Sequence, residues 1–194
     1  KRSLKYIYES KLDNKISDKE KSLNWDKLAF ETIHSILQVA KNYPNLKFTF
    51  KTKVKKDLQT AEQQKLINKF NLDNCKIVYG GNSINQIKNS KFVIGFNTTG
   101  IIESLIAGKK VLTPYFDIEK DEFKKKFILD DYNLALKAKN TDEFKNLLKD
   151  LIEDKKELNI IDEKILKNLS IEHIGNADGL SGEKLREAIS KIII

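Results

Sequence analysis

The sequence contains few of the residues that crosslink a chain or interrupt its secondary structure. Its 194 residues include one cysteine, two prolines, eight glycines and two histidines, and no methionine. The single cysteine, Cys75, excludes an internal disulfide, and one cysteine with two histidines cannot form a typical structural zinc site. Because Cys75 adjoins an apolar run, we predict that it is a small buried hydrophobic residue in a reducing compartment.

Long hydrophobic runs and common catalytic motifs are also missing. No stretch of about 18 apolar residues occurs and charged residues open the chain, so we expect neither a membrane-spanning helix nor a signal peptide. P-loop, G-x-S-x-G and G-x-G-x-x-G motifs are absent. The chain starts without methionine, directly in a strand-like segment, and we therefore expect a fragment of a longer protein.

Positive charge is in excess, but it is spread along the whole chain. The 36 lysines and arginines are interleaved with 28 acidic residues, which gives a formal net charge of +8. Lysine greatly outnumbers arginine, whereas readout of nucleic-acid bases favours arginine, so we expect no nucleic-acid partner. The charge is equally compatible with weak attraction to anionic membrane surfaces or to anionic substrates.

Strand and helix patterns alternate along the chain with short connections. Apolar residues spaced by three and four predict a helix at residues 25–41, capped by Asn24, and strict alternation predicts a strand at residues 46–52. The other predicted strands are residues 4–10, 76–79, 91–95, 110–114 and 135–139, and the other helices are residues 61–70, 83–88, 101–107 and 141–154. Alternation of this kind is typical of parallel βαβ units.

We therefore predict one nucleotide-binding α/β domain that covers residues 1–194. It is expected to be Rossmann-like, with a doubly wound, mainly parallel sheet, helices on both faces, and residues 92–94 and 111–113 as neighbouring strands. The tail differs, because residues 162–170 have a helical pattern, residues 173–181 are irregular and polar, and residues 182–194 end in a helix. We expect the loop and helix of residues 171–194 to pack on a neighbouring surface, because apolar residues of the last helix share a face; these are Leu185, Ile189 and Ile192.

The clearest candidate ligand site lies within residues 92–108, where a strand is followed by a small polar turn, a helix and a glycine stop. In open parallel sheets ligands bind beyond the carboxyl ends of the strands, and a helix that begins there offers backbone N–H groups to an anion. The turn consists of Asn97, Thr98, Thr99 and Gly100, whose small side chains let a phosphate approach the backbone. Gly108 is expected to end the helix in a left-handed C-cap.

Glu103 follows in the first turn of the predicted helix. There its carboxylate could accept hydrogen bonds from a ribose diol, or it could cap the helix by reaching back to a backbone N–H. The residues alone leave both alternatives open.

The run FVIGFNTTGIIESLIAGKKVLTPYFD (residues 92–117) resembles the donor-binding half of GT-B glycosyltransferases, particularly bacterial enzymes that build capsular and other surface polysaccharides. The resemblance implies that residues 97–100 hold the donor phosphates and that Glu103 meets the ribose. Residues 107–109 match the helix end of that family, whereas Lys110 stands where the family usually has proline.

Two further segments, a strand end and a turn, fit the same resemblance. The strand FTFKTK ends in Lys51 and Lys53, which would face the donor phosphate, although Lys53 stands where the family has histidine. The turn YGGNS places Gly80, Gly81 and Asn82 where such domains pass the nucleobase. Solvated lysines and a plain turn are the alternatives, and neither needs a ligand.

The chain has two histidines, which differ in their expected surroundings. His34 lies on the predicted helix of residues 25–41 and is expected at its surface or partly buried. His173 opens the run HIGNADGL, which resembles a closing motif of bacterial surface carbohydrate biosynthesis proteins and adds Asn176 and Asp178 as candidate binding residues. The alternative is structural, since Asp178 begins a turn and Ser181 is a suitable N-cap.

The resemblance implies the sugar-nucleotide-binding domain of a cytoplasmic glycosyltransferase, acting at the inner face of the plasma membrane. Its partners would be a nucleotide-activated sugar, a glycan or lipid-linked acceptor, and a missing N-terminal acceptor domain, with no cofactor or metal. The catalytic residues are not identified, and the isolated domain should bind without turnover. The alternatives are a CDP-polyol phosphotransferase or a hydrolysing sugar-nucleotide epimerase of the same fold, and a non-catalytic scaffold.

Overall fold

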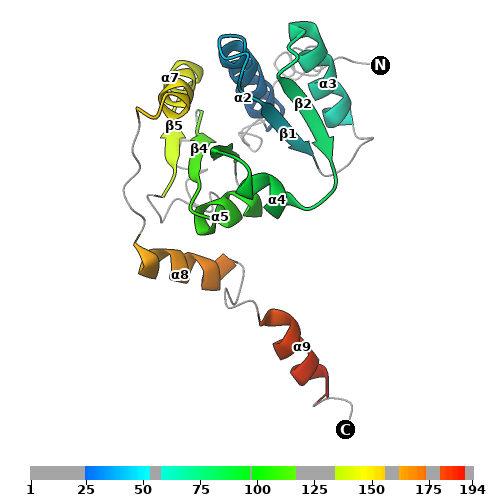
Figure 1. The fold of residues 1–194 in the computed structure, drawn as a ribbon, viewed down its shortest axis with the longest axis vertical. Helices are drawn as coiled ribbons and strands as arrows, with labels where there is room; N and C mark the ends of the chain where they lie inside the picture. The colour runs from blue at the N-terminus through cyan, green and yellow to red at the C-terminus, as the bar shows by residue number, and fades with distance from the viewer. Residues whose placement is uncertain are drawn as a thin grey trace, which may run out of the picture.

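The chain forms an α/β fold with parallel strands (Figure 1). The structure is a computed structural model that describes residues 25–52, 58–96, 98–116, 134–155, 162–173 and 180–190. Its elements are α2 (Trp25–Ala40), β1 (Phe48–Thr52), α3 (Leu58–Phe70), β2 (Cys75–Tyr79), α4 (Ser83–Lys88), β3 (Phe92–Ile94), α5 (Thr99–Ile106), β4 (Lys110–Pro114), β5 (Leu136–Ala138), α7 (Thr141–Ile152), α8 (Glu163–His173) and α9 (Ser181–Ser190). The predicted strand at residues 4–10 and the predicted cap Asn24 lie outside the described residues.

The described strands form two small sheets. β1 pairs with β2, and a second sheet has the order β3-β4-β5, with every pair parallel. Val93 lies opposite Val111 across the β3–β4 pair, so the prediction that residues 92–94 and 111–113 are neighbouring strands is confirmed. The prediction of an α/β fold with parallel strands is also confirmed, whereas the described strands do not join into one sheet.

The central strand β4 is covered by helices on both faces. Val111 and Leu112 are both 0% exposed and, as successive residues of a strand, point to opposite faces. Val111 packs with apolar side chains of α5 and α8, which include Ile102 and Leu169. Leu112 packs in a larger cluster that contains Leu37 of α2 and residues of α7. Helices therefore lie on both sides of this strand, as predicted.

The helix α2 lies between α3 and α7. The ring of His34 on α2 meets the ring of Phe70 on α3 edge to face, with a centroid distance of 5.3 Å. Burial lowers the pKa of His34, and the cations of Lys145 on α7 and Lys69 on α3 lower it further. His34 is thus a partly buried helix residue, as predicted, with neighbours on the helices to either side.

Cys75 begins β2 and is 8% exposed. Burial raises the pKa of its thiol to about 11, so the thiol stays protonated and poorly nucleophilic at neutral pH. The prediction of a small buried hydrophobic residue is confirmed at this position.

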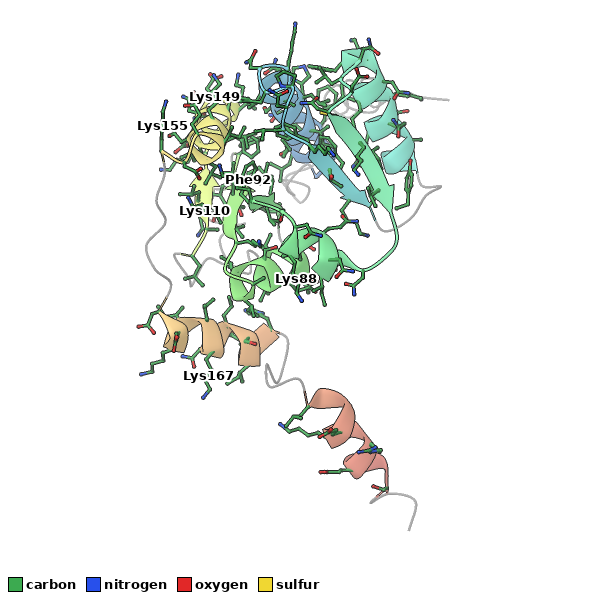
Figure 2. The ribbon with its side chains drawn as sticks, in the orientation of Figure 1. Lys88, Phe92, Lys110, Lys149, Lys155 and Lys167 are labelled. Atoms are coloured by element: carbon green, nitrogen blue, oxygen red, sulfur yellow. The ribbon has the colours of Figure 1, made fainter. Side chains whose placement is uncertain are left out.

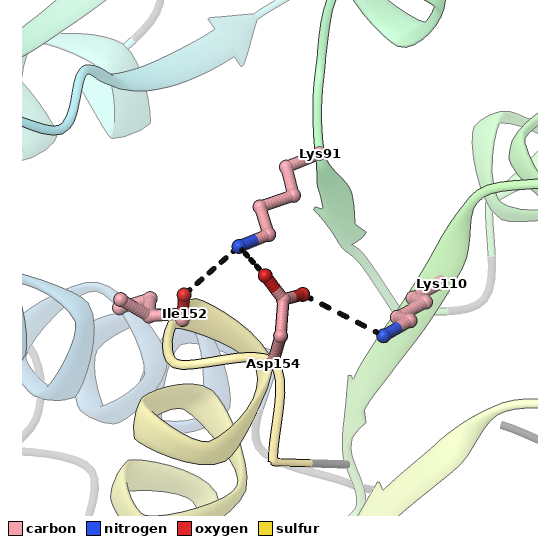
Figure 3. Close-up of polar contacts among 4 residues, drawn as sticks. All are labelled: Lys91, Lys110, Ile152 and Asp154. Carbon is pink, nitrogen blue, oxygen red and sulfur yellow. Dashed lines mark hydrogen bonds and ion pairs between the residues drawn. The ribbon is translucent and has the colours of Figure 1, made fainter. Parts of the chain in front are cut away.

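A group of charged side chains joins the end of α7 to the amino ends of β3 and β4 (Figure 3). The Nζ of Lys91 donates to the carbonyl of Ile152 at 2.9 Å and to Asp154 at 2.6 Å, and the Nζ of Lys110 lies 3.8 Å from Asp154. The hydrogen bond from Lys91 lowers the pKa of Asp154. A cation at the C-terminus of a helix also interacts favourably with the helix dipole. These two lysines therefore support the fold at the edge opposite to the candidate site.

The predicted loop that begins at His173 is wrong at its first residue, because α8 continues to His173. The helix packs on α5 through Leu169, which is 0% exposed, and the three residues that follow Ser170 include no glycine or proline that would end the helix.

In Figure 1, α9 projects away from the strands and their helices. The side chains of Leu185 and Ile189 and all of Ile192 lie outside the described residues, so the predicted packing of α9 is not tested. None of the helices in the described ranges is long and apolar enough to cross a lipid bilayer.

The lowered pKa of His34 predicts a pH-dependent stability. The unfolded chain takes up a proton at His34 near the ordinary pKa of 6.5, while the folded state resists protonation. Below about pH 6.5 the unfolded state therefore binds more protons, and the free energy of unfolding falls as the pH falls. We expect the thermal unfolding midpoint to decrease from about pH 7.5 to about pH 5, and to decrease less in His34→Gln.

His173→Gln is the matched control for this experiment, because the chain has only two histidines. The decrease should remain in the control. Asp142, Glu153 and Asp154 have pKa values lowered by neighbouring groups, so they titrate below this pH range. An equal decrease in His34→Gln and in the unchanged chain would contradict the prediction.

Candidate functional site

The predicted phosphate loop follows β3 and leads into α5. Thr98 has an extended backbone (φ −128°, ψ 147°), and its hydroxyl accepts a hydrogen bond from the N–H of Gly100 at 3.4 Å. Thr98 is therefore the N-cap, and the helix begins at Thr99, two residues earlier than predicted. Thr98 and Thr99 are exposed, and Asn97 lies outside the described residues.

Gly95 allows α5 to approach the end of β3 closely. A Cβ atom at Gly95 would lie 2.7 Å from Cγ2 of Ile101, a contact that side chains do not tolerate. Ile101 is 0% exposed, and a buried β-branched side chain has little freedom to move away. No role was predicted for Gly95 from the sequence. Its position directly between an apolar strand and a polar turn could have indicated a close backbone approach.

Glu103 lies in the second turn of α5, and the prediction of the first turn is wrong because the helix begins earlier. Its carboxylate accepts a hydrogen bond from the hydroxyl of Ser83, the first residue of α4, at 3.4 Å. The capping role belongs to Thr98. Of the two alternatives for Glu103, the cap therefore loses its structural basis, and the carboxylate joins the start of α4 to α5.

The turn between β2 and α4 lies beside this contact. Gly80 and Gly81 have φ values of 55° and 72°, in the left-handed region that favours glycine. No heavy atom lies within 4 Å of a Cβ built at either glycine, among the neighbours that the structure describes. The side chain of Asn82 accepts a hydrogen bond from the N–H of Ile84 at 2.8 Å and caps α4. Among the described residues there is thus space beside both glycines, whereas the side-chain oxygen of Asn82 already caps α4.

Lys51 is exposed near the carboxyl end of β1. Its Nζ donates to the carbonyl of Thr52 at 3.0 Å, and the N–H of Gly80 donates to the same carbonyl at 3.3 Å. Lys51 and the glycine turn thus meet at one backbone oxygen. Lys53 lies outside the described residues.

The helices α4 and α5 run side by side in the same direction. Ser83 at the start of α4 contacts Glu103, and the Nζ of Lys109, beyond the end of α5, donates to the carbonyl of Lys88 at the end of α4. Each helix follows directly on a strand, β2 or β3, so the carboxyl ends of these strands lie at the same edge. Lys51, the glycine turn, Thr98 and Glu103 are therefore gathered at this edge, which we call the carboxyl edge.

The other predicted binding residues are His173, Asn176 and Asp178, near the C-terminal end of the chain. His173 lies at the end of α8, one turn beyond Leu169, which packs against α5. Asn176 and Asp178 lie outside the described residues. The predicted binding role of His173 stays a prediction.

Other lysines are dispersed over the molecule. Figure 2 labels Lys88, Lys110, Lys149, Lys155 and Lys167, which lie on or beside α4, β4, α7 and α8. This distribution agrees with the interleaved charges of the sequence. The described residues contain no group of three or more His, Cys, Asp or Glu side chains that could hold a metal ion.

Comparison of the chain with known proteins gave no match to any family model, curated protein or solved structure. The candidate site is therefore defined by its own geometry.

The close approach at Gly95 predicts that Gly95→Ala is destabilising. Overpacking of a well-packed core typically costs about 1–3 kcal/mol, so the free energy of unfolding should fall by roughly that amount. Gly100→Ala is the matched control, because a Cβ at Gly100 has its nearest neighbours at 3.9 Å and no positive φ is required there. Denaturant titration of both variants measures the difference. A Gly95→Ala variant as stable as Gly100→Ala would contradict the close approach.

Proposed function

We propose that the chain is the sugar-nucleotide-binding domain of a GT-B glycosyltransferase that acts in bacterial surface polysaccharide biosynthesis. The resemblance of residues 92–117 to the donor-binding half of that family suggests it. The observation that carries it is the hydrogen bond between Ser83 and Glu103. That bond holds the predicted nucleobase turn next to the helix whose N-terminus is the predicted phosphate site.

The start of α5 suits the donor phosphates. The first N–H groups of a helix have no partner within the helix, and the helix dipole favours an anion at this end. The bond from Gly100 to the Thr98 hydroxyl is 3.4 Å, long for an N–H···O bond, so a phosphate oxygen could replace the hydroxyl as acceptor. Lys51 adds a positive charge near the end of β1. Such groups can stabilise a departing phosphate without a metal ion.

Glu103 suits the ribose. A carboxylate has about four acceptor sites, and one long hydrogen bond from Ser83 leaves most of them available. The two hydroxyl groups of a ribose are donors, and the contact with Ser83 restricts the orientation of the carboxylate before a ligand arrives. The arrangement binds a diol without moving a side chain.

The glycine turn suits the nucleobase. Gly80 and Gly81 have no side chain to block their backbone groups, and because the N–H of Gly80 already donates to the carbonyl of Thr52, a base would meet the other backbone groups of the turn. Backbone groups of this kind can pair with the edge of a base, and their pattern would decide which base fits. The acceptor, a glycan or a lipid-linked sugar, and the catalytic base would belong to the missing N-terminal domain, so this chain should bind the donor without turnover.

The proposal predicts binding of a nucleotide and its dependence on Glu103. Isothermal titration calorimetry with UDP, CDP, CMP and GDP should identify one or more ligands. Glu103→Ala should weaken that binding by about 1–3 kcal/mol, the loss expected for a hydrogen bond to a charged group, which is roughly 5-fold to 150-fold in Kd. Thermal stability should change little, because Thr98 caps the helix.

Glu163→Ala on α8 is the matched control, since Glu163 is an exposed carboxylate of another helix. It should leave the affinity unchanged. Unchanged affinity in Glu103→Ala would show that the site is misplaced. Silence toward all four nucleotides at millimolar concentration would favour the non-catalytic scaffold. Products formed from labelled donors by the intact parent protein would separate a glycosyltransferase from a phosphotransferase or an epimerase.

A further inference from the structure

Three residues lie side by side across the sheet β3-β4-β5, at the same level of its strands. Thr113 of β4 pairs with Lys137 of β5, and paired residues of parallel strands point to the same face of a sheet. The N–H of Gly95 donates to the carbonyl of Leu112, which places Gly95 opposite Thr113 on the other side of β4. We call Gly95, Thr113 and Lys137 the polar row.

The polar row lies on the face of the sheet that α5 covers, near the carboxyl ends of the strands. Thr113 is two residues beyond Val111, so both side chains point to the same face, and Val111 packs with residues of α5. A Cβ at Gly95 would meet the side chains of Ile101 and Thr98 at 2.7 and 3.4 Å. The start of α5 therefore lies over the Gly95 end of the row.

Thr113 has a polar group that the fold leaves unpaired. Its side chain is fully buried, and its hydroxyl has no hydrogen-bond partner among the described residues. A buried hydroxyl without a partner costs free energy, whereas a valine of similar shape would fill the position without this cost. Since most buried polar groups are paired, the exception at Thr113 points to a partner from outside the chain.

Lys137 brings a positive charge to the other end of the row. It is half-buried, and its Nζ lies 5.3 Å from the centre of the Tyr115 ring. Tyr115 follows β4 and packs in the same cluster as Val111, on the α5 face. The ammonium group is thus held near the carboxyl end of β4, beside Thr113.

We propose that Thr113 and Lys137 form a second phosphate position next to the start of α5. The inference rests on the proposed function, which places the nucleobase at the glycine turn after β2 and the first phosphate at the backbone N–H groups after β3. The next group along the carboxyl edge then reaches β4, the strand beside β3. There the hydroxyl of Thr113 donates to a phosphate oxygen, and Lys137 on the neighbouring strand compensates its charge.

Thr98 opens the way to this position. Its methyl group lies against Gly95, next to Thr113, and its hydroxyl accepts the long hydrogen bond of 3.4 Å from Gly100. An anion that takes this N–H releases the Thr98 hydroxyl, and the exposed side chain then turns away from Gly95. Thr113 becomes accessible by this movement, since it is fully buried otherwise.

NMR titration of the full chain with phosphate and pyrophosphate, and with the pairs UMP and UDP, CMP and CDP, and GMP and GDP, tests the second position. In the unchanged chain a diphosphate should bind at least about tenfold more tightly than the matching monophosphate. Thr113→Val should reduce this ratio at least about fivefold, because it removes the hydroxyl that meets the second phosphate. Lys137→Gln should reduce the ratio as well. Neither variant should change the Kd of the monophosphates.

Matched variants separate the second position from general effects. Thr113→Ser keeps a hydroxyl and should keep the ratio. Ser170→Ala removes another buried hydroxyl that has no partner among the described residues, and it should leave the ratio unchanged. Lys149→Gln removes a lysine of α7, which covers the other face of the sheet, and it should also have no effect. The thermal unfolding midpoint of Thr113→Val should equal or exceed that of the unchanged chain.

An unchanged ratio in Thr113→Val would overturn the second position. A clear drop in its thermal midpoint would do the same, because it would show that the hydroxyl has a structural partner. Equal affinity of the unchanged chain for monophosphates and diphosphates, or no binding of any of these anions, would also overturn it. A Thr113-dependent ratio for pyrophosphate, with no nucleotide bound, would support the second position and reject only the proposed function.

Discussion

The burial of β4 on both faces is the constraint on which the rest of the described fold depends. Because Val111 and Leu112 point to opposite sides and both are fully buried, β4 needs a helix layer on each side. One layer contains α2 and α7, and the other contains α5 and α8. The strand has no polar face to turn toward water, so neither layer can be removed without exposing apolar surface. The placement of α5, and with it the carboxyl edge, follows from this requirement.

The close contact at Gly95 determines how α5 lies against β3 and therefore where the candidate site begins. Ile101 sits against the backbone of Gly95, and this contact sets how near the first turn of α5 lies to the end of β3. Thr98 must then bridge a short distance in extended conformation and is positioned to cap the helix. The helix end is equally defined, since Gly108 adopts a left-handed conformation and the N–H of Lys109 bonds to the carbonyl of Ser104. Both ends of α5 are thus fixed by local chemistry.

Elements with strong local signals could be predicted from the sequence, and those set by distant contacts could not. The bounds of α4 and β4 agree with the prediction because a cap or a glycine stop marks them. The predicted start of α5 at residue 101 is two residues too late. Several small polar residues precede the helix, and the sequence alone does not show that Thr98 is the one that caps it. α8 extends to His173 because its packing on α5 outweighs the loop pattern. The contact between Ser83 and Glu103 joins residues 20 positions apart and has no local signal.

The amino and carboxyl ends of the strands differ in electrostatics, and this difference bears on the proposed ligand. At the amino ends of β3 and β4, the cations of Lys91 and Lys110 share Asp154, so part of their positive charge is compensated. At the carboxyl edge, the Nζ of Lys51 donates to the neutral carbonyl of Thr52, and no ion pair of Lys51 with an acidic side chain occurs among the described residues. Glu103 carries the opposite charge and would repel a phosphate. In the proposed site, an anionic ligand would therefore direct its phosphates to the start of α5 and its neutral hydroxyl groups to Glu103, which is the polarity of a nucleotide.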